Sequence, residues 1–172
     1  KYKSDKNSYL LKKFAPGEKV SDEGLIEFAH SPEISSKLLE FFGDRYQFLA
    51  ADYWLTKDSY ANEAVGSQKY HTDPEDSVMC KVFVYFTDVG DKNGPTEIIC
   101  NTKVGGSAKL RPWHARKLTG KYYSNEFVES LVKEQELERF LATGKKGNIV
   151  FLNTTALHKG GKGSKSRIMA NY

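Results

Sequence analysis

The order of strand-like and helix-like segments constrains the fold of this chain more than any other feature. Short runs rich in Val, Ile, Phe and Tyr recur in the second half, separated by turn clusters, at residues 79–87, 96–100, 147–152 and 167–172. Strands that alternate with helices would indicate a doubly wound parallel sheet, and this order lacks that alternation. Strands on both sides of one helical insertion predict a mainly β fold with flanking helices, a double-stranded β-helix (jelly-roll or cupin-like) barrel.

The chain divides into a helical lead-in and a β-rich core. Residues 1–60 form the lead-in, where Pro32 starts a helix that carries apolar residues at helical spacing and ends at Gly43. Residues 47–54 are apolar and aromatic, as is typical of a first strand. A length of 172 residues suits one domain, so we expect residues 1–172 to fold as a single unit.

The predicted core covers residues 61–172 and contains a helical insertion at about 105–145. Within it, residues 125–141 place Phe127, Leu131 and Leu137 at helical spacing between charged residues, which predicts an amphipathic helix. Residues 160–164 read as a turn before the closing strand.

Composition excludes several classes of function. The net charge is +4, from 26 Lys and Arg against 22 Asp and Glu, which is too balanced to indicate nucleic-acid binding. The apolar runs are too short to cross a bilayer, and the first residues do not resemble a signal peptide, so we expect a cytoplasmic protein without membrane contact. Cys80 and Cys100 have no CxxC spacing and are expected to be reduced thiols.

Three side chains form a candidate metal site. His71 and Asp73 are two positions apart, so on an extended segment both point to one face, and His158 supplies a second imidazole 87 residues later. Two imidazoles and one carboxylate suit Fe(II) and leave coordination positions open for a cosubstrate and O₂. Alone, the His-x-Asp pattern is weak, because an ordinary half-buried strand histidine followed by a turn-capping aspartate explains it as well.

Arg167 lies nine residues after His158, across a glycine-rich turn, on the predicted last strand. A hairpin would bring its guanidinium beside the metal, where it can bind a carboxylate through two hydrogen bonds. The alternative is a surface arginine in a basic hairpin that also holds Lys159, Lys162 and Lys165. The same basic turn would suit a substrate that is anionic.

The sequence resembles the phytanoyl-CoA dioxygenase family of Fe(II)/2-oxoglutarate oxygenases. The resemblance runs in order through five blocks from residue 68 to the end: residues 68–73 (QKYHTD), 81–89 (KVFVYFTDV), 93–96 (NGPT), 147–152 (GNIVFL) and 155–160 (TALHKG) followed by Arg167. Residues 28–43 are similar to the family's N-terminal part with less specificity.

The resemblance implies iron ligands at His71, Asp73 and His158 and a 2-oxoglutarate anchor at Arg167. Gln68 and Thr96 match positions where family members contact 2-oxoglutarate. The alternative for Gln68 is a hydrogen bond at a strand end, and the alternative for Thr96 is a hydroxyl that bonds across two strands. The implied reaction consumes Fe(II)-bound 2-oxoglutarate and O₂, releases succinate and CO₂, and oxidises a C–H bond of a small-molecule substrate.

Some positions depart from the family pattern or leave alternatives open. Residues 100–103 (CNTK) replace a Pro-Gly-Ser-His stretch, and Gly160 replaces a serine that would assist Arg167. Asp73 is retained, whereas halogenating relatives have a small residue there, so we expect a hydroxylase or another oxidative enzyme and not a halogenase. A cupin-type metalloenzyme that does not use 2-oxoglutarate and an inactive jelly-roll binding module remain alternatives.

Other residues carry weaker predictions. Lys81 and Tyr85 share one strand face, and either could face the cosubstrate, although a solvated lysine and a core tyrosine are the simpler expectation. Residues 53–54 (YW) are expected in the core. Trp113 and His114 lie in a basic loop that could cover the pocket or simply anchor on the barrel.

Overall fold

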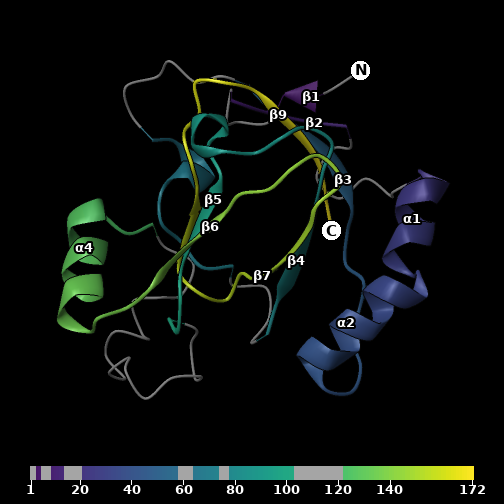
Figure 1. Cartoon of the computed structure of the whole chain (residues 1–172), viewed down its shortest axis with the longest axis horizontal. Coiled ribbons are helices and arrows are strands. Elements are labelled where there is room, and N and C mark those ends of the chain that lie inside the picture. Colours follow the sequence, from purple (N-terminus) through teal and green to yellow (C-terminus); the bar gives the residue numbers. More distant parts are fainter. Residues whose placement is uncertain (1–2, 5–8, 14–20, 58–63, 74–77, 103–121) are drawn as a thin grey trace.

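We describe the fold from a computed structural model that places residues 3–4, 9–13, 21–57, 64–73, 78–102 and 122–172 (Figure 1). The predicted cover at Trp113 and His114 lies outside these residues, as does most of the predicted insertion before residue 122. No helix in the described part of the chain has the length and apolar character needed to cross a lipid bilayer.

The described strands form two antiparallel sheets. The larger sheet has six strands in the order β1-β2-β3-β9-β4-β7. Their bounds are Lys3–Ser4, Leu10–Lys12, Asp52–Thr56, Arg167–Asn171, Cys80–Tyr85 and Ile149–Asn153 respectively. The smaller sheet has the order β6-β5-β8, with bounds Arg139–Ala142, Thr96–Ile99 and His158–Gly160. The mainly β prediction is therefore confirmed, while closure into a barrel stays a prediction.

The main core lies between the two sheets. Phe83 and Tyr85 of β4 and Met169 of β9 pack with Ile98 of β5 and Ala142 of β6, and all five are at most 7% exposed. Since strand side chains alternate between faces, Lys81, Phe83 and Tyr85 of β4 share the face that looks toward the smaller sheet. The Tyr85 hydroxyl donates to the Ala142 carbonyl over 2.6 Å, as expected for a core tyrosine.

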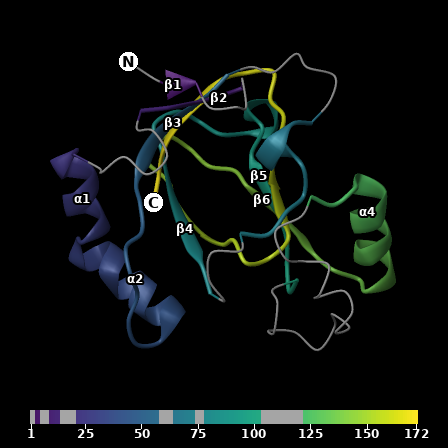
Figure 2. The ribbon, with the colours of Figure 1, turned by 180° about the vertical axis from the view of Figure 1, so that it is seen from behind.

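Two helices cover the outer face of the larger sheet. Helix α1 (Glu23–Ala29) is capped by Asp22, and α2 (Pro32–Phe42) ends at Gly43, whose φ of +87° suits glycine. Ile34 and Leu38 of α2 pack on Val82, one of the β4 side chains that point away from the main core. Figures 1 and 2 show α1 and α2 at one side of the sheets and α4 at the opposite side.

The predicted helix at residues 125–141 is too long. Helix α4 covers Asn125–Glu134, Glu136 has a φ of +51°, and β6 begins at Arg139. Residues 139–142 pair with β5 instead, and this non-local pairing overrides a spacing that also fits a helix. The lead-in also contains β1 and β2, two short strands with no predicted counterpart, and the first predicted strand begins later, at Asp52.

Candidate active site

His71 and His158 lie side by side although they are far apart in sequence. Their backbones form an isolated antiparallel bridge, in which each residue donates to the carbonyl of the other over 2.8 and 2.9 Å. The two imidazole centroids are 4.3 Å apart. His158 begins β8, and its position next to β5 is fixed by the Ile98–His158 register.

Backbone carbonyls orient both imidazoles. Nδ1 of His71 is 2.8 Å from the Lys69 carbonyl oxygen, and Nδ1 of His158 is 2.9 Å from that of Ala156. A carbonyl only accepts hydrogen bonds, so each Nδ1 carries a proton, which leaves the Nε2 lone pair for a metal ion when the imidazole is neutral. This is the arrangement that commonly orients metal-binding histidines.

Asp73 faces both lone pairs. Its Oδ1 is 3.9 Å from Nε2 of His71, and its Oδ2 is 3.8 Å from Nε2 of His158. The Asp73 backbone N–H donates to the Thr154 carbonyl over 3.0 Å, which ties this residue to the end of β7. The ligand atoms of the three residues all lie within 4.8 Å of one another.

Lys81 is a fourth polar residue at this cluster, and it places a positive charge beside Asp73. Its Nζ is 2.6 Å from Oδ2 of Asp73, so the expectation of a solvated lysine is wrong. Burial alone would raise the pKa of Asp73, but Lys81 and then His158 act in the opposite direction, and the pKa lies below its ordinary value. The carboxyl is therefore ionised at neutral pH.

Burial and the neighbouring His71 lower the pKa of His158 to about 4. A neutral imidazole and an ionised carboxylate are the forms that bind metal ions. Two imidazole nitrogens and one carboxylate, with no thiolate, fit Fe(II). A cation bound at this cluster would also be repelled by the positive charge of Lys81.

A pocket of about 50 Å³ adjoins the cluster. Its lining includes both histidines together with Thr96, Gly160 and Arg167. Arg167 is 4% exposed, its Nε donates to Oγ1 of Thr56 over 3.4 Å, and its Nη1 has no hydrogen-bond partner among the described residues. A buried guanidinium nitrogen without a partner is costly, and a ligand carboxylate would satisfy it. Burial lowers the pKa of Arg167 from its ordinary value.

The sequence matches the phytanoyl-CoA dioxygenase (PhyH) family over residues 20–169. The chain belongs to this family. A search of curated protein sequences found no significant match.

Solved structures share the fold of this PhyH-family chain. The non-haem alpha-ketoglutarate-dependent epimerase SnoN, from nogalamycin biosynthesis, has a TM-score of 0.66 at 13% identity, with 95% of this chain and 61% of SnoN covered. HygX from Streptomyces hygroscopicus has a TM-score of 0.60 at 12% identity, with 99% of this chain and 71% of HygX covered. EctD from S. alaskensis has a TM-score of 0.58 at 15% identity, with 95% of this chain and 54% of EctD covered. The PhyH-family chain thus spans about three fifths of SnoN and about half of EctD.

Gln68 and Thr96, the two other cosubstrate positions predicted for this PhyH-family chain, lie in different surroundings. Thr96 is 5% exposed and lines the small pocket. Gln68 is buried in the 3-10 turn Gly66–Gln68, where its Oε1 accepts from the Val65 N–H over 3.2 Å, and it is not among the pocket residues. Its Nε2 has no partner in the described part of the chain. Both assignments stay predictions.

Two residues of β3, Trp54 and Thr56, also line the pocket, and Trp54, which was expected in the core, packs against the core as well. The buried indole Nε1 of Trp54 has no hydrogen-bond partner within the described ranges. Thr56 shares a strand face with Trp54, and its hydroxyl accepts from Nε of Arg167, so Arg167 has a hydroxyl partner although Gly160 replaces the family serine. Trp54 and Thr56 are two positions apart in β3, so the alternation of side chains along a strand would have placed both in the pocket once the inward face of β3 was known.

The CNTK stretch of the PhyH-family chain supports the second histidine. Thr102 is fully buried, and its hydroxyl donates to the Ile99 carbonyl and accepts from the Leu157 N–H, both over 2.7 Å. Leu157 directly precedes His158, so Thr102 fixes the start of β8.

The positive charge of Lys159, the first residue of the basic turn, is largely balanced by its neighbours. Lys159 lies 3.6 Å from Glu97 and 4.1 Å above the Tyr70 ring. Contact between this turn and an anionic substrate stays a prediction.

Proposed function

We propose that this chain is an Fe(II)- and 2-oxoglutarate-dependent oxygenase that hydroxylates a C–H bond of a small molecule. The observation that carries the proposal is the convergence of His71, Asp73 and His158, with lone pairs and carboxylate within 4.8 Å and Arg167 in the same pocket. Membership of the PhyH family supports it independently.

His71, Asp73 and His158 would hold the iron, and Arg167 would bind the far carboxylate of 2-oxoglutarate. Among the related structures, SnoN is described in complex with Fe³⁺ and alpha ketoglutarate, EctD with 2-oxoglutarate, and HygX with nickel and 2-oxoglutarate. When bound, iron and 2-oxoglutarate supply the oxidising chemistry, in which O₂, 2-oxoglutarate and a C–H bond yield succinate, CO₂ and an alcohol.

The chain itself supplies orientation and shielding. The Lys69 and Ala156 carbonyls hold the imidazoles in the metal-binding tautomer, and Thr154 fixes the backbone of Asp73. Thr56 and Arg167 would bind the polar end of the cosubstrate, and Leu10, Trp54 and Phe83 are apolar side chains of the same lining that would help to exclude bulk water. We propose hydroxylation rather than halogenation, because Asp73 would occupy the position where halogenating relatives have a small residue.

The test is succinate formation from 2-oxoglutarate with Fe(II) and O₂, in the wild-type chain and in the His71→Ala and Asp73→Ala variants. We expect slow substrate-independent turnover in the wild type and at least about a hundredfold less in either variant, because each loses one of three ligands. Turnover in both variants at the wild-type rate would show that the metal binds elsewhere.

A further inference from the structure

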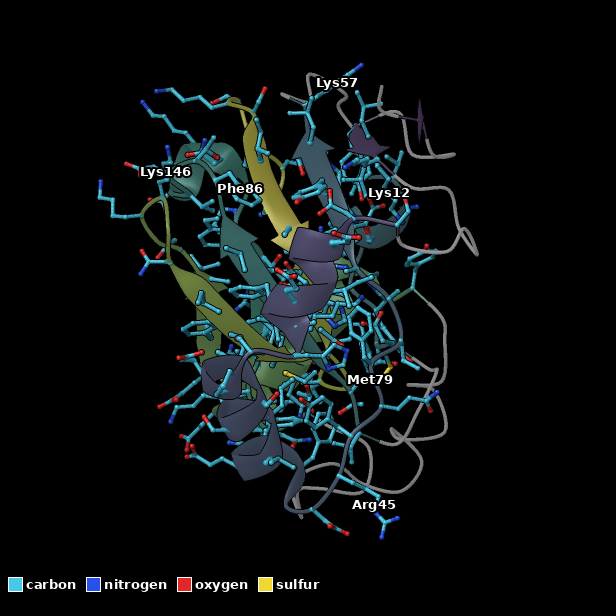
Figure 3. The ribbon with its side chains drawn as sticks, turned by 90° about the vertical axis from the view of Figure 1, so that its right-hand side faces the viewer. Lys12, Arg45, Lys57, Met79, Phe86 and Lys146 are labelled. Carbon is cyan, nitrogen blue, oxygen red and sulfur yellow. The ribbon has the colours of Figure 1, made fainter. Side chains whose placement is uncertain are left out.

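A second, much larger pocket lies next to the metal pocket. Its volume is about 530 Å³, within the usual range for small-molecule sites. Helix α2, residues 45–50 and the start of β4 line it, with the last two residues of the chain. In Figure 3, Met79 marks the β4 side of this region and Arg45 lies at the lower, outer end.

Lys81 joins the two pockets. Of the described residues, it alone lines both of them. Its Nζ is 2.6 Å from Oδ2 of Asp73, so one side chain separates the inner end of the large pocket from a proposed iron ligand. Lys81 therefore connects the large pocket, on the α2 side of β4, with the metal pocket on the inner face of the same strand.

The walls of the large pocket are mostly apolar. Ile34, Leu38 and Phe42 of α2 form one side, and Leu49 and Val78 lie at its edge. Leu49 is 63% exposed and Val78 is 47% exposed. Large apolar side chains that gather at a hollow and remain in contact with water commonly mark a binding site.

The charged residues of this pocket are positive. Its described lining contains Arg45 and Lys81 and neither Asp nor Glu. The charge of Lys81 is balanced by Asp73. Arg45 has only the exposed neighbour Asp44, at 3.4 Å, and such exposed pairs contribute little. Arg45 is thus the cation that a ligand anion can reach.

We propose that this pocket is the substrate site and that the substrate is a largely apolar organic anion, with its anionic group near Arg45 and its apolar body directed toward Lys81 and the metal. This inference rests on the proposed function, because it takes His71, Asp73 and His158 as the reaction centre.

The test uses 4-phenylbutyrate as a probe on the full chain loaded with Mn(II). Calorimetry measures binding of the probe, and proton relaxation measures its proximity to the paramagnetic ion, with Zn(II)-loaded protein as the diamagnetic reference. We expect binding together with faster relaxation of the probe in the Mn(II) form. Binding with equal relaxation in the two forms would overturn the proposal, and so would the absence of binding.

Variants test the pocket and its charge separately. Ala50→Trp and Val78→Trp fill the pocket from two exposed positions, and both should weaken binding at least about tenfold. Arg45→Gln should weaken it about twofold to fivefold. Lys37→Gln, which removes the same charge from the exposed face of α2, should leave it unchanged. Equal binding by the Trp variants would overturn the site, and equal binding of the neutral 4-phenylbutan-1-ol would overturn the anionic class.

The outcome separates this inference from the proposed function. Electron paramagnetic resonance reports Mn(II) binding without the probe. If the wild type fails to bind Mn(II), the proposed function fails even where calorimetry still detects the probe. If Mn(II) binds and the probe does not, this inference alone is overturned.

Discussion

Lys81 would compete with a bound metal ion for the carboxylate of Asp73. Its ammonium group lies 2.6 Å from Oδ2, and it would repel a divalent cation held by the same side chain. We therefore expect Lys81→Met to tighten Mn(II) binding by about tenfold, as measured by electron paramagnetic resonance titration.

The matched control is Lys159→Met, because Lys159 pairs with Glu97 at 3.6 Å and does not line the metal pocket. This change removes the same charge and should leave Mn(II) affinity nearly unaltered. Weaker binding in Lys81→Met would mean that Lys81 mainly positions Asp73.

Burial of His158 makes the metal-free chain sensitive to acid. The pKa of His158 is about 4 in the folded chain, against about 6.5 for an ordinary histidine, so between these values the unfolded chain binds a proton that the folded chain does not. The free energy of unfolding should fall by about 3 kcal/mol from this residue as the pH drops from 6.5 to 4.

Urea unfolding of chelator-treated protein across this pH range measures the effect. In His158→Gln the corresponding part of the pH dependence should vanish. An identical slope in the variant would contradict the assigned burial.

At single positions, the sequence predicted which three proposed ligands converge better than it predicted their surroundings. His71, Asp73 and His158 carry chemistry that their residue types reveal, and the structure brings them together. Lys81 was expected in solvent, because only the pairing of β4 with β7 and β9 shows that its odd-numbered face looks inward.

Strand β8 is held against β5 by a close backbone crossing. A Cβ added to Gly161 would lie 2.5 Å from the Pro95 carbonyl oxygen and 2.8 Å from the Gly94 carbonyl carbon. We expect Gly161→Ala to lower the free energy of unfolding by about 2–4 kcal/mol, because backbone atoms must move to accommodate the methyl group.

Gly90→Ala is the matched control for this change. A Cβ there meets nothing within 4 Å, and its φ of −120° suits any residue. It should change stability by less than about 1 kcal/mol in urea unfolding. If both substitutions lowered the free energy of unfolding equally, the close backbone crossing at Gly161 would not be the feature that fixes β8.

Elements with strong local patterns were predictable, and those made by distant pairing were not. Helix α2 and strand β4 follow apolar spacing and turn signals that lie within the elements themselves. Strands β1 and β8 have two and three residues, too few to show a period. They exist because β2 and β5 supply hydrogen-bond partners.

Across the whole molecule, two sheets place the proposed ligands between them, and the N-terminal helices border the large pocket. The antiparallel mainly β architecture followed from segment order. The position of α1 and α2 on the outer face, and hence the pocket, depends on packing that no local pattern encodes (Figure 1).

The most direct test is anaerobic binding of 2-oxoglutarate to the Fe(II)-loaded chain, measured by calorimetry, in the wild type and in Arg167→Gln. We expect binding that requires Fe(II), disappears with a chelator, and weakens at least about tenfold in the variant, which loses a charged hydrogen-bond donor but leaves no buried charge. Binding of 2-oxoglutarate that is equally strong without metal, or no binding at all by the Fe(II)-loaded wild type, would contradict the account.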